Sequence, residues 1–288
     1  MQVTMLTDVE PRPRRVAVGE FDGVHLGHRE VIAGNDTVLT FEPHPLAVIR
    51  PQAAPRLLTS LDAKIELIAG LGVQELVVIP FDEVFAGQTP SEFIEQVLIT
   101  KLCATHISVG ENFRFGHGAE GDTDMLRADP RFEARVVRLV EVDGEIVSSS
   151  HIRALVSAGD VEHAGRFLGS PFQLRGEVVH GDQRGRLLGF PTANIVPDED
   201  LVCPGHGIYA ARADGICAAV SVGVRPTFGT GRAVLVEAFL LDYAQDLYGR
   251  VLRVDFISRL RGERRFETAQ ELVEQMEIDV AQTRERCR

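Results

Sequence analysis

Two histidines, His25 and His28, stand three residues apart with Gly27 between them. Imidazole N–H groups and the backbone N–H groups at a helix start both donate hydrogen bonds to phosphate oxygens. Gly23 precedes the first histidine by two residues, and glycine lets a ligand approach the backbone closely. The spacing therefore predicts a site for a triphosphate, although these residues alone also fit an ordinary capped turn.

Two further polar groups could complete that site. Ser149 and Ser150 are good helix N-cap residues, and Arg153 would fall in the first turn of the same helix. Hydroxyls, backbone N–H groups and a guanidinium suit phosphate, but a capped helix with a solvated arginine explains the same residues. Asn112 follows a predicted strand, where ligands of parallel sheets collect.

A second segment, residues 181–194, is rich in glycine and arginine. It lacks the Gly-Lys-Ser/Thr of a Walker A loop, so phosphate binding must be argued from the residues present. Thr192 and Asn194 carry oxygen ligands that Mg²⁺ accepts, although Pro-Thr-Ala-Asn also reads as the start of an ordinary strand. The candidate phosphate ligands here are Gly181, Gly185, Arg186, Gly189, Thr192 and Asn194.

Glu237 is the one polar residue in the apolar run 233–241. Strand alternation places it on the same face as Leu235 and Phe239. Such a carboxylate is either a residue at a barrel rim or a general base, whose pKa burial would raise. The residues alone leave both interpretations open.

The elements that position these residues change character along the chain. In the first half, apolar runs alternate with helical segments, which predicts β–α–β units and a Rossmann-like parallel sheet. The expected strands are 16–18, 38–41, 76–81, 106–110 and 136–140, and the expected helices are 26–33, 60–71 and 93–102. The histidines then fall at a strand-to-helix turn. Asp143-Gly144 predicts a hairpin before the serines.

In the second half, short strands and Gly-rich turns predict a closed antiparallel β-barrel. The expected strands are 174–179, 207–213, 216–222, 233–241 and 251–258. A terminal helix starts at a capping box of Thr268 and Glu271 and would cover the barrel with Leu272, Met276 and Val280. We expect two domains, 1–168 and 169–288, linked by residues 160–169.

Composition narrows the class of protein. The 288 residues suffice for two domains, and a net charge of −12 opposes extended binding to nucleic acid. Neither a zinc knuckle nor a disulfide framework is suggested by the scattered Cys103, Cys203, Cys217 and Cys287. There is no secretory h-region and no run of about 18 apolar residues. We expect a cytoplasmic protein with no membrane partner; the oligomeric state is not indicated.

The order of the first-half motifs, together with Thr40-Phe41-Glu42-Pro43-His44-Pro45 and residues 110–116, resembles bacterial bifunctional riboflavin kinase/FMN adenylyltransferases, also called FAD synthetases. The resemblance implies a nucleotidylyltransferase domain that uses ATP to adenylylate FMN to FAD, releasing pyrophosphate. It implies that His25 and His28 hold the ATP phosphates. It also implies that the nucleotide site is completed by Asn112, Ser149, Ser150 and Arg153.

The second half resembles riboflavin kinase from end to end, on Gly-Arg-Leu-Leu-Gly-Phe-Pro-Thr-Ala-Asn, Gly207-Ile208-Tyr209, Val236-Glu237-Ala238-Phe239 and Asp246-Leu247-Tyr248-Gly249. The resemblance implies phosphorylation of riboflavin to FMN. It implies that Thr192 and Asn194 bind Mg²⁺ and ATP phosphates. Glu237 would take the proton from the riboflavin 5′-hydroxyl, since an attacking alcohol needs a base.

Two departures from the family pattern concern the first half. The helix after the histidines is short, and Ile146 stands where some relatives carry a basic residue, a contact that Arg114 could supply. The alternatives are therefore a riboflavin kinase with an inactive adenylyltransferase domain, or a non-catalytic flavin-binding protein.

Overall fold

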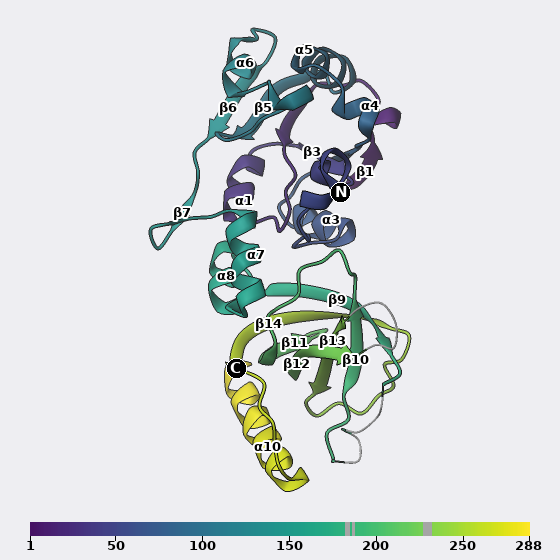
Figure 1. Ribbon diagram of the computed structural model, residues 1–288. Helices are drawn as coiled ribbons and strands as arrows, with labels where there is room; N and C mark the ends of the chain where they lie inside the picture. Colours follow the sequence, from purple (N-terminus) through teal and green to yellow (C-terminus); the bar gives the residue numbers. More distant parts are fainter. Residues whose placement is uncertain (182–184, 186–187, 227–231) are drawn as a thin grey trace. The chain divides into compact units, whose positions relative to one another are not determined.

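The computed structural model describes the chain except for residues 182–184, 186–187 and 227–231. Arg186, one of the predicted phosphate ligands, lies outside the described residues. The chain divides into two compact units, Met1–Ser149 and Ser150–Arg288. Each unit is described by itself below (Figure 1).

The first unit is built on a parallel sheet of six strands, in the order β1-β4-β3-β2-β5-β6. The strands are β1 (Gln2–Met5), β2 (Arg14–Val18), β3 (Thr37–Glu42), β4 (Glu75–Pro80), β5 (Ala104–Gly110) and β6 (Glu133–Val137). The predicted Rossmann-like α/β class is confirmed. β1 was not predicted, and β6 begins and ends three residues before the predicted run 136–140.

Helices cover both faces of this sheet. On one face, Val31 and Ile32 of α1 (Leu26–Ile32) and Ile68 of α3 (Leu61–Ala69) join one buried cluster. On the other face, Phe93 and Val97 of a π-helix, η3 (Phe93–Lys101), join a second cluster. The shorter helical segments are η1 (Leu6–Asp8), α2 (Pro45–Ile49), η2 (Pro51–Ala53), α4 (Glu83–Ala86), α5 (Pro90–Glu92), η4 (His117–Ala119) and α6 (Thr123–Ala128).

Local signals placed several of these elements correctly. Ser60 caps α3, and the side chains and backbones of Thr89 and Glu92 form the capping box before η3. The helix at 93–102 exists, but its hydrogen bonding is that of a π-helix. Asp143 and Gly144 both have positive φ, as a type I′ turn requires, and they join β7 (Glu141–Val142) to β8 (Glu145–Ile146) in the predicted hairpin.

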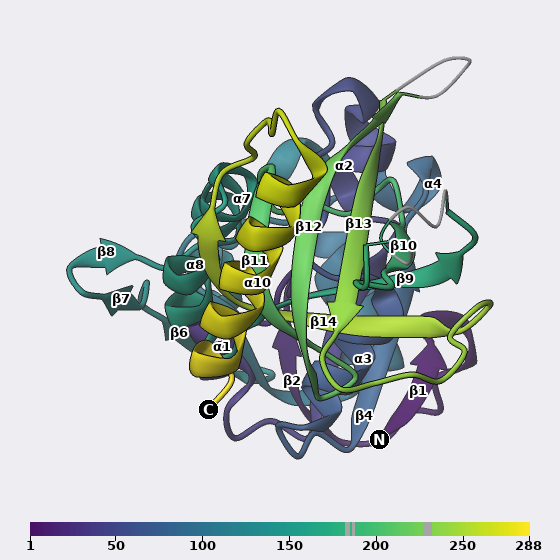
Figure 2. The same cartoon turned by 90° about the horizontal axis from the view of Figure 1, so that it is seen from below.

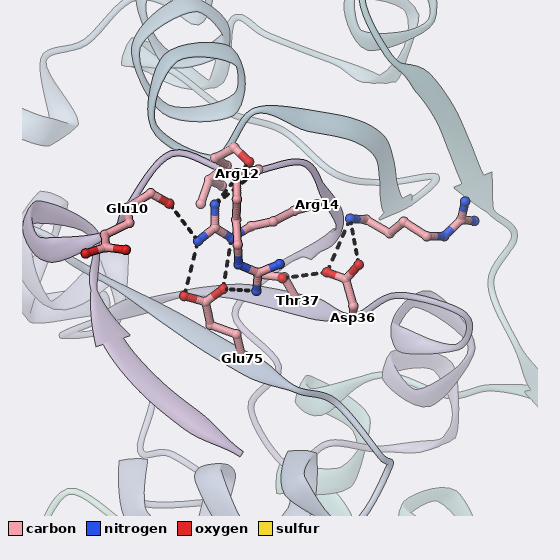
Figure 3. Close-up of polar contacts among 8 residues, drawn as sticks. Glu10, Arg12, Arg14, Asp36, Thr37 and Glu75 are labelled. Atoms are coloured by element: carbon pink, nitrogen blue, oxygen red, sulfur yellow. Dashed lines mark hydrogen bonds and ion pairs between the residues drawn. The ribbon is translucent and has the colours of Figure 1, made fainter.

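A buried ion network closes the amino edge of the sheet (Figure 3). Arg14 is 2% exposed, and its Nε donates to Glu75 Oε2 at 2.8 Å. The Arg14 guanidinium also donates to the carbonyl oxygens of Glu10, Arg12 and Leu102. Burial alone would raise the pKa of Glu75, but hydrogen bonds and positive charge from Arg14 and Arg12 hold it below its ordinary value.

The second unit is a closed antiparallel barrel, in the order β10-β13-β12-β11-β14-β9, as predicted. Its strands are β9 (Phe172–Val179), β10 (Ala193–Pro197), β11 (Gly207–Ala213), β12 (Ile216–Pro226), β13 (Arg232–Leu240) and β14 (Val251–Arg261). β10 is the strand that the Pro-Thr-Ala-Asn alternative anticipated. Val236 and Ala238 of β13 are fully buried, so this face of the strand lines the barrel interior.

The helices that accompany the barrel among the described residues are α7 (Ser149–Ala158), α8 (Val161–Leu168) and α10 (Ala269–Arg286). The predicted linker 160–169 is instead helix α8, capped by Asp160, ended by Gly169 and packed on β9 and β14. α10 contacts β11, β12 and β14, as expected of the covering helix. No helix among the described residues is both long and apolar enough to cross a membrane.

The buried face of α10 is more polar than predicted. Leu272, Met276 and Val280 are half-buried, whereas Asp279 and Thr283 are buried. Arg261 of β14 explains this burial, because its Nη2 lies 2.6 Å from Asp279 Oδ2 and its Nε donates to Asp279 Oδ1 at 2.9 Å. A two-point ion pair therefore fastens the helix to the barrel.

Candidate functional sites

The topology of the first unit singles out one place on its sheet. From β2 the chain adds β3 and β4 on one side, while β5 and β6 lie on the other, so β2 and β5 flank the point where the strand order reverses. Open α/β sheets bind ligands at the carboxyl ends of the strands at such a point. The turn carrying His25 and His28 follows β2, and Asn112 follows β5, so the fold places both predicted motifs at this edge.

The two histidines form one rigid unit. His25 is the N-cap of α1, and its Nδ1 accepts a hydrogen bond from the backbone N–H of His28 at 3.2 Å. The two rings stack, with centroids 3.5 Å apart and planes 16° apart. An imidazole whose Nδ1 accepts carries its proton on Nε2, so His25 presents that nitrogen as a donor. A side chain at Gly27 would meet the His25 ring at 3.2 Å, which explains the glycine.

The turn before the histidines is conformationally strained. Phe21 and Val24 have positive φ angles of 52° and 41°, and Gly23 has 83°. A β-branched valine rarely adopts this conformation, and such strain persists only where the surroundings enforce it. Strained backbone concentrates at functional sites, which supports a functional role for this turn.

Buried hydrogen bonds enforce that strain. The Asp22 carboxylate accepts from the backbone N–H groups of Leu58 and Thr59 at 2.9 and 3.1 Å. The backbone N–H of Gly23 donates to Thr59 Oγ1 at 3.1 Å. Gly23 therefore contributes its conformation to the turn, and its N–H serves the protein interior. The sequence marked Asp22 only as a turn residue and did not mark Thr59.

The serine cluster reaches the turn through one residue. Ser149 Oγ donates to the backbone carbonyl of Asp22 at 2.9 Å, which joins two motifs that lie 127 residues apart. Ser150 and Arg153 belong to the second unit, where Arg153 Nη1 donates to Ser150 Oγ at 3.4 Å. Their predicted contact with the triphosphate stays a prediction.

The suggested substitute for a basic residue at position 146 is engaged elsewhere. Arg114 Nε donates to the carbonyl of Ala119 at 3.1 Å, and its Nη1 lies 3.6 Å from the Asp122 carboxylate. Ile146 itself is exposed on the β7–β8 hairpin. Arg114 thus stabilises its own loop.

Glu20 is a titratable residue at this edge that the sequence analysis missed. Burial raises its pKa to about 8, with smaller increases from the charges of Asp22 and Glu42 and a decrease from Lys64. Lys64 is buried on α3. The burial of Lys64 could have been predicted from the sequence, because Lys64 stands four residues before Ile68, on the apolar face of that helix.

In the second unit, strand register assembles the predicted kinase residues. Asn194 of β10 lies directly opposite Glu237 of β13, and Glu237 lies opposite Ser221 of β12. Glu237 is half-buried and shares the outer barrel face with Leu235 and Phe239, as alternation predicted. The carboxylate and the amide are therefore cross-strand neighbours.

The glycines of the preceding segment fit tightly around these side chains. A Cβ on Gly181 would lie 2.3 Å from Asn194 Nδ2, and one on Gly185 would lie 2.3 Å from the carbonyl of Phe190 and 3.5 Å from Thr192 Oγ1. Asn194 is only 6% exposed. The structure thus brings Gly181 and Gly185 against Asn194 and Thr192, whereas Gly189 has open space around its Cα and a φ of 89°.

The donor set in this unit fits Mg²⁺ only in combination with a nucleotide. Among the described residues, no cluster of three or more His, Cys, Asp or Glu side chains could hold a metal ion. Thr192 and Asn194 provide a hydroxyl and an amide oxygen, both hard ligands. Mg²⁺ commonly takes one or two protein ligands and completes its shell with water and substrate phosphates.

Family models match both halves of the chain. The model described as FAD synthetase matches residues 8–151, and the model described as riboflavin kinase matches residues 168–287. The first match contains the double-histidine turn, Asn112 and the serines, and the second contains Thr192, Asn194 and Glu237.

Individual relatives agree with the family models. The bifunctional riboflavin kinase/FMN adenylyltransferase of Bacillus subtilis is 38% identical, covering 92% of this chain and 89% of that protein. The protein of the same name from Escherichia coli K12 is 36% identical, covering 94% and 91%. A solved structure described as a macrolide-efflux protein from Streptococcus pneumoniae has a TM-score of 0.90 at 29% identity and covers 99% of each chain.

Proposed function

The chain belongs to the bifunctional riboflavin kinase/FMN adenylyltransferase family, and we propose that its two family regions divide the reactions between the residues described above. The C-terminal region phosphorylates riboflavin to FMN with ATP. The N-terminal region transfers the adenylyl group of ATP to FMN, giving FAD and pyrophosphate. The observation that carries the residue assignment is the stacked histidine pair at the reversal point of the parallel sheet. We propose a domain boundary at 168/169; the start of the riboflavin kinase match at residue 168 supports it.

Adenylyl transfer needs positioning and charge stabilisation. The FMN phosphate attacks the α-phosphorus of ATP and pyrophosphate leaves in line, so no protein nucleophile is required. His25 and His28 donate to phosphate oxygens from a turn that Asp22 and Thr59 hold rigid. Ser149 is anchored on the Asp22 carbonyl. Ser150, Arg153 and Asn112 are proposed to complete the nucleotide site.

Phosphorylation of riboflavin additionally needs a base. The 5′-hydroxyl attacks the γ-phosphorus of ATP, ADP leaves, and Glu237 takes the proton of the hydroxyl. Asn194, directly opposite Glu237, and Thr192 would hold Mg²⁺, which supplies positive charge to the ATP phosphates. Gly181 and Gly185 keep the preceding segment close to these two side chains, and Gly189 is proposed as a further phosphate neighbour.

The shortness of the first helix does not break the nucleotide fold. α1 has 7 residues, yet β2 and β3 pair in parallel register on either side of it. The crossover is therefore complete, which favours an active N-terminal region over the alternative of an inactive one. Use of Mg²⁺, a cytoplasmic location and the absence of nucleic-acid and membrane partners remain proposals that rest on composition and on the family.

The decisive assay supplies purified protein with riboflavin, ATP and Mg²⁺ and separates the flavins by chromatography. We expect FMN and FAD to appear in that order. FMN without FAD would leave a monofunctional kinase. Neither product, with riboflavin still bound, would indicate a flavin carrier.

Single substitutions separate the two sites. We expect His28→Ala to lower FAD formation from supplied FMN at least about 100-fold while FMN formation continues. Glu237→Ala should lower FMN formation by about 100-fold or more and leave FAD formation from supplied FMN intact. The exposed residues His117 and Glu177 provide matched alanine controls that should retain both activities. Loss of both activities in either folded site variant contradicts two independent sites.

A further inference from the structure

Glu20 is fixed at the ligand-binding edge of the first unit. It follows β2 directly and precedes Asp22 by two residues. Its backbone carbonyl accepts a hydrogen bond from Thr40 Oγ1 of β3 at 3.1 Å. The Glu20 backbone is thus held against β3 at the start of the turn that carries His25 and His28. Figure 2 shows the helices and strands from a second direction.

The Glu20 side chain is half-buried, and three charged side chains act on its carboxyl through space. Its Oε2 atom is buried and has no hydrogen-bond partner within the described parts of the chain. Lys64 of α3, which is 4% exposed, Asp22 of the turn and Glu42 at the end of β3 act on it through space. His25 and His28 follow on the same turn. A buried carboxylate oxygen without a donor is costly, so the neutral acid is favoured.

A bound polyphosphate shifts the protonation equilibrium of Glu20 toward the neutral acid. The triphosphate brings several negative charges to the turn, and a neighbouring carboxylate repels them strongly where water is excluded. A neutral Glu20 does not repel them. Phosphate binding and the proton on Glu20 therefore favour each other, because each stabilises the state in which the other is present.

We propose that Glu20 is a proton-linked binding residue of the N-terminal site: it must carry a proton when ATP phosphates occupy the turn, and Lys64 and Glu42 set the pH at which that proton is lost. This inference rests on the proposed function of the His25 and His28 turn. It adds an acid to a phosphate site whose assigned residues are all hydrogen-bond donors.

The direction of the pH effect follows from the free protein. Burial places the pKa of Glu20 near 8, so below pH 8 the acid is already neutral and binding takes up little proton. Above pH 8 the carboxylate forms, and binding must first restore its proton. The affinity for ATP at this site should then fall by up to about tenfold for each further pH unit.

Calorimetric titration with MgATP, in the absence of flavin, measures this proton directly. At pH 8.5, in two buffers with different ionisation enthalpies, the wild-type protein should take up about 0.7 proton more per N-terminal site than Glu20→Gln. The substitution leaves the second unit unchanged, so proton exchange at the kinase site cancels in the difference. Equal proton uptake by the two proteins would overturn the inference.

Kinetics supply a second readout that a structural role would not move. In the wild type, the KM for ATP in FAD formation should rise about tenfold between pH 7 and pH 9, and kcat should not fall. In Glu20→Gln, the KM for ATP should stay constant over the same range. Lys64→Met should move the rise to higher pH, because it removes the cation that lowers the pKa of Glu20. Glu42→Gln should move it to lower pH. Profiles that coincide in all four proteins would contradict the proposal.

Failure of the inference is distinguishable from failure of the proposed function. If His28→Ala still binds ATP and forms FAD normally, the phosphate site lies elsewhere and both proposals fall. If His28→Ala is inactive but Glu20→Gln keeps the wild-type pH profile and proton uptake, only the role of Glu20 is wrong.

Discussion

Two glutamates at opposite edges of the same sheet have pKa values that are shifted in opposite directions. Glu75 begins β4 at the amino edge, and Glu20 follows β2 at the carboxyl edge. The pKa of Glu75 is held below its ordinary value by Arg14 and Arg12, whereas burial raises that of Glu20 to about 8. The difference lies in the cation: Arg14 bonds Glu75 directly at 2.8 Å, whereas Lys64 acts on Glu20 only through space.

The contrast separates a structural edge from the edge at which we propose that the nucleotide binds. At the amino edge, the Arg14 guanidinium donates to a carboxylate and three backbone carbonyls, so a buried charge is fully compensated. The carboxyl edge carries a strained turn, stacked imidazoles and the Glu20 side chain, whose buried Oε2 has no hydrogen-bond partner among the described residues. A buried polar atom without a partner is costly in a folded protein, and perturbed titratable groups are frequent at sites that bind a ligand.

Glu75→Gln is the change expected to have the largest effect on this comparison. It leaves the Arg14 guanidinium buried without its counter-ion, which should lower the free energy of unfolding of the first unit by about 3–5 kcal/mol at pH 7. Hydrogen exchange of the β2, β3 and β4 amides measures the unit by itself. Glu133→Gln, an exposed glutamate of β6, is the matched control.

The loss in Glu75→Gln should itself depend on pH. A carboxyl whose pKa is lowered in the folded state contributes stability above its unfolded pKa of about 4.5, and this stability is lost as pH falls through the folded-state pKa. The difference from wild type should therefore shrink on acidification. A constant difference down to pH 3 would show that the amide disturbs the sheet by its shape.

Glu20→Gln should have the opposite sign. Between pH 4.5 and about 8 the folded protein holds a proton on Glu20 that the unfolded chain releases, so this residue lowers stability as pH rises through that window. An isosteric amide should then stabilise the first unit by up to about 4 kcal/mol at pH 8 and have little effect near pH 4.5. Hydrogen exchange at the two pH values provides the measurement; destabilisation at pH 8 would indicate that the carboxylate is needed for the fold.

Local patterns sufficed for much of the molecule. Residues close in sequence determine the strands β2 to β5 and the Asp-Gly hairpin, so the sequence predicted them. The position of the His25 and His28 turn was predicted from the strand that precedes it. β1 lies at the exposed edge of the sheet and carries no strong pattern, so it was not predicted. β10 has only five residues and was anticipated only as one of two interpretations of Pro-Thr-Ala-Asn. The π-helical bonding of η3 follows a capping box that would suit an α-helix equally well.

The missed residues share a physical cause. Whether a charged side chain is buried depends on partners that are distant in sequence, as Arg261 is from Asp279 and Glu20 is from Lys64. The hydrogen bonds from the backbone N–H groups of Leu58 and Thr59 to the Asp22 carboxylate likewise join segments that no local sequence pattern connects. Sequence patterns located the donors that we propose bind phosphate, but the buried charges and hydrogen bonds around them appeared only in the folded chain.

Arg12→Ala should be the smallest perturbation of the amino edge and shows which cation matters there. Arg12 Nη2 lies 2.6 Å from Glu75 Oε2, closer than Arg14 Nε, but its side chain is 44% exposed. Water and salt screen an exposed pair, so its loss should cost less than about 1 kcal/mol, and the cost should diminish further in 0.5 M salt. Hydrogen exchange of the same amides tests this. A loss as large as that of Glu75→Gln would mean that the exposed Arg12, and not the buried Arg14, keeps Glu75 ionised. The difference between Glu75 and Glu20 would then come from the distance to the nearest cation and not from the burial of that cation.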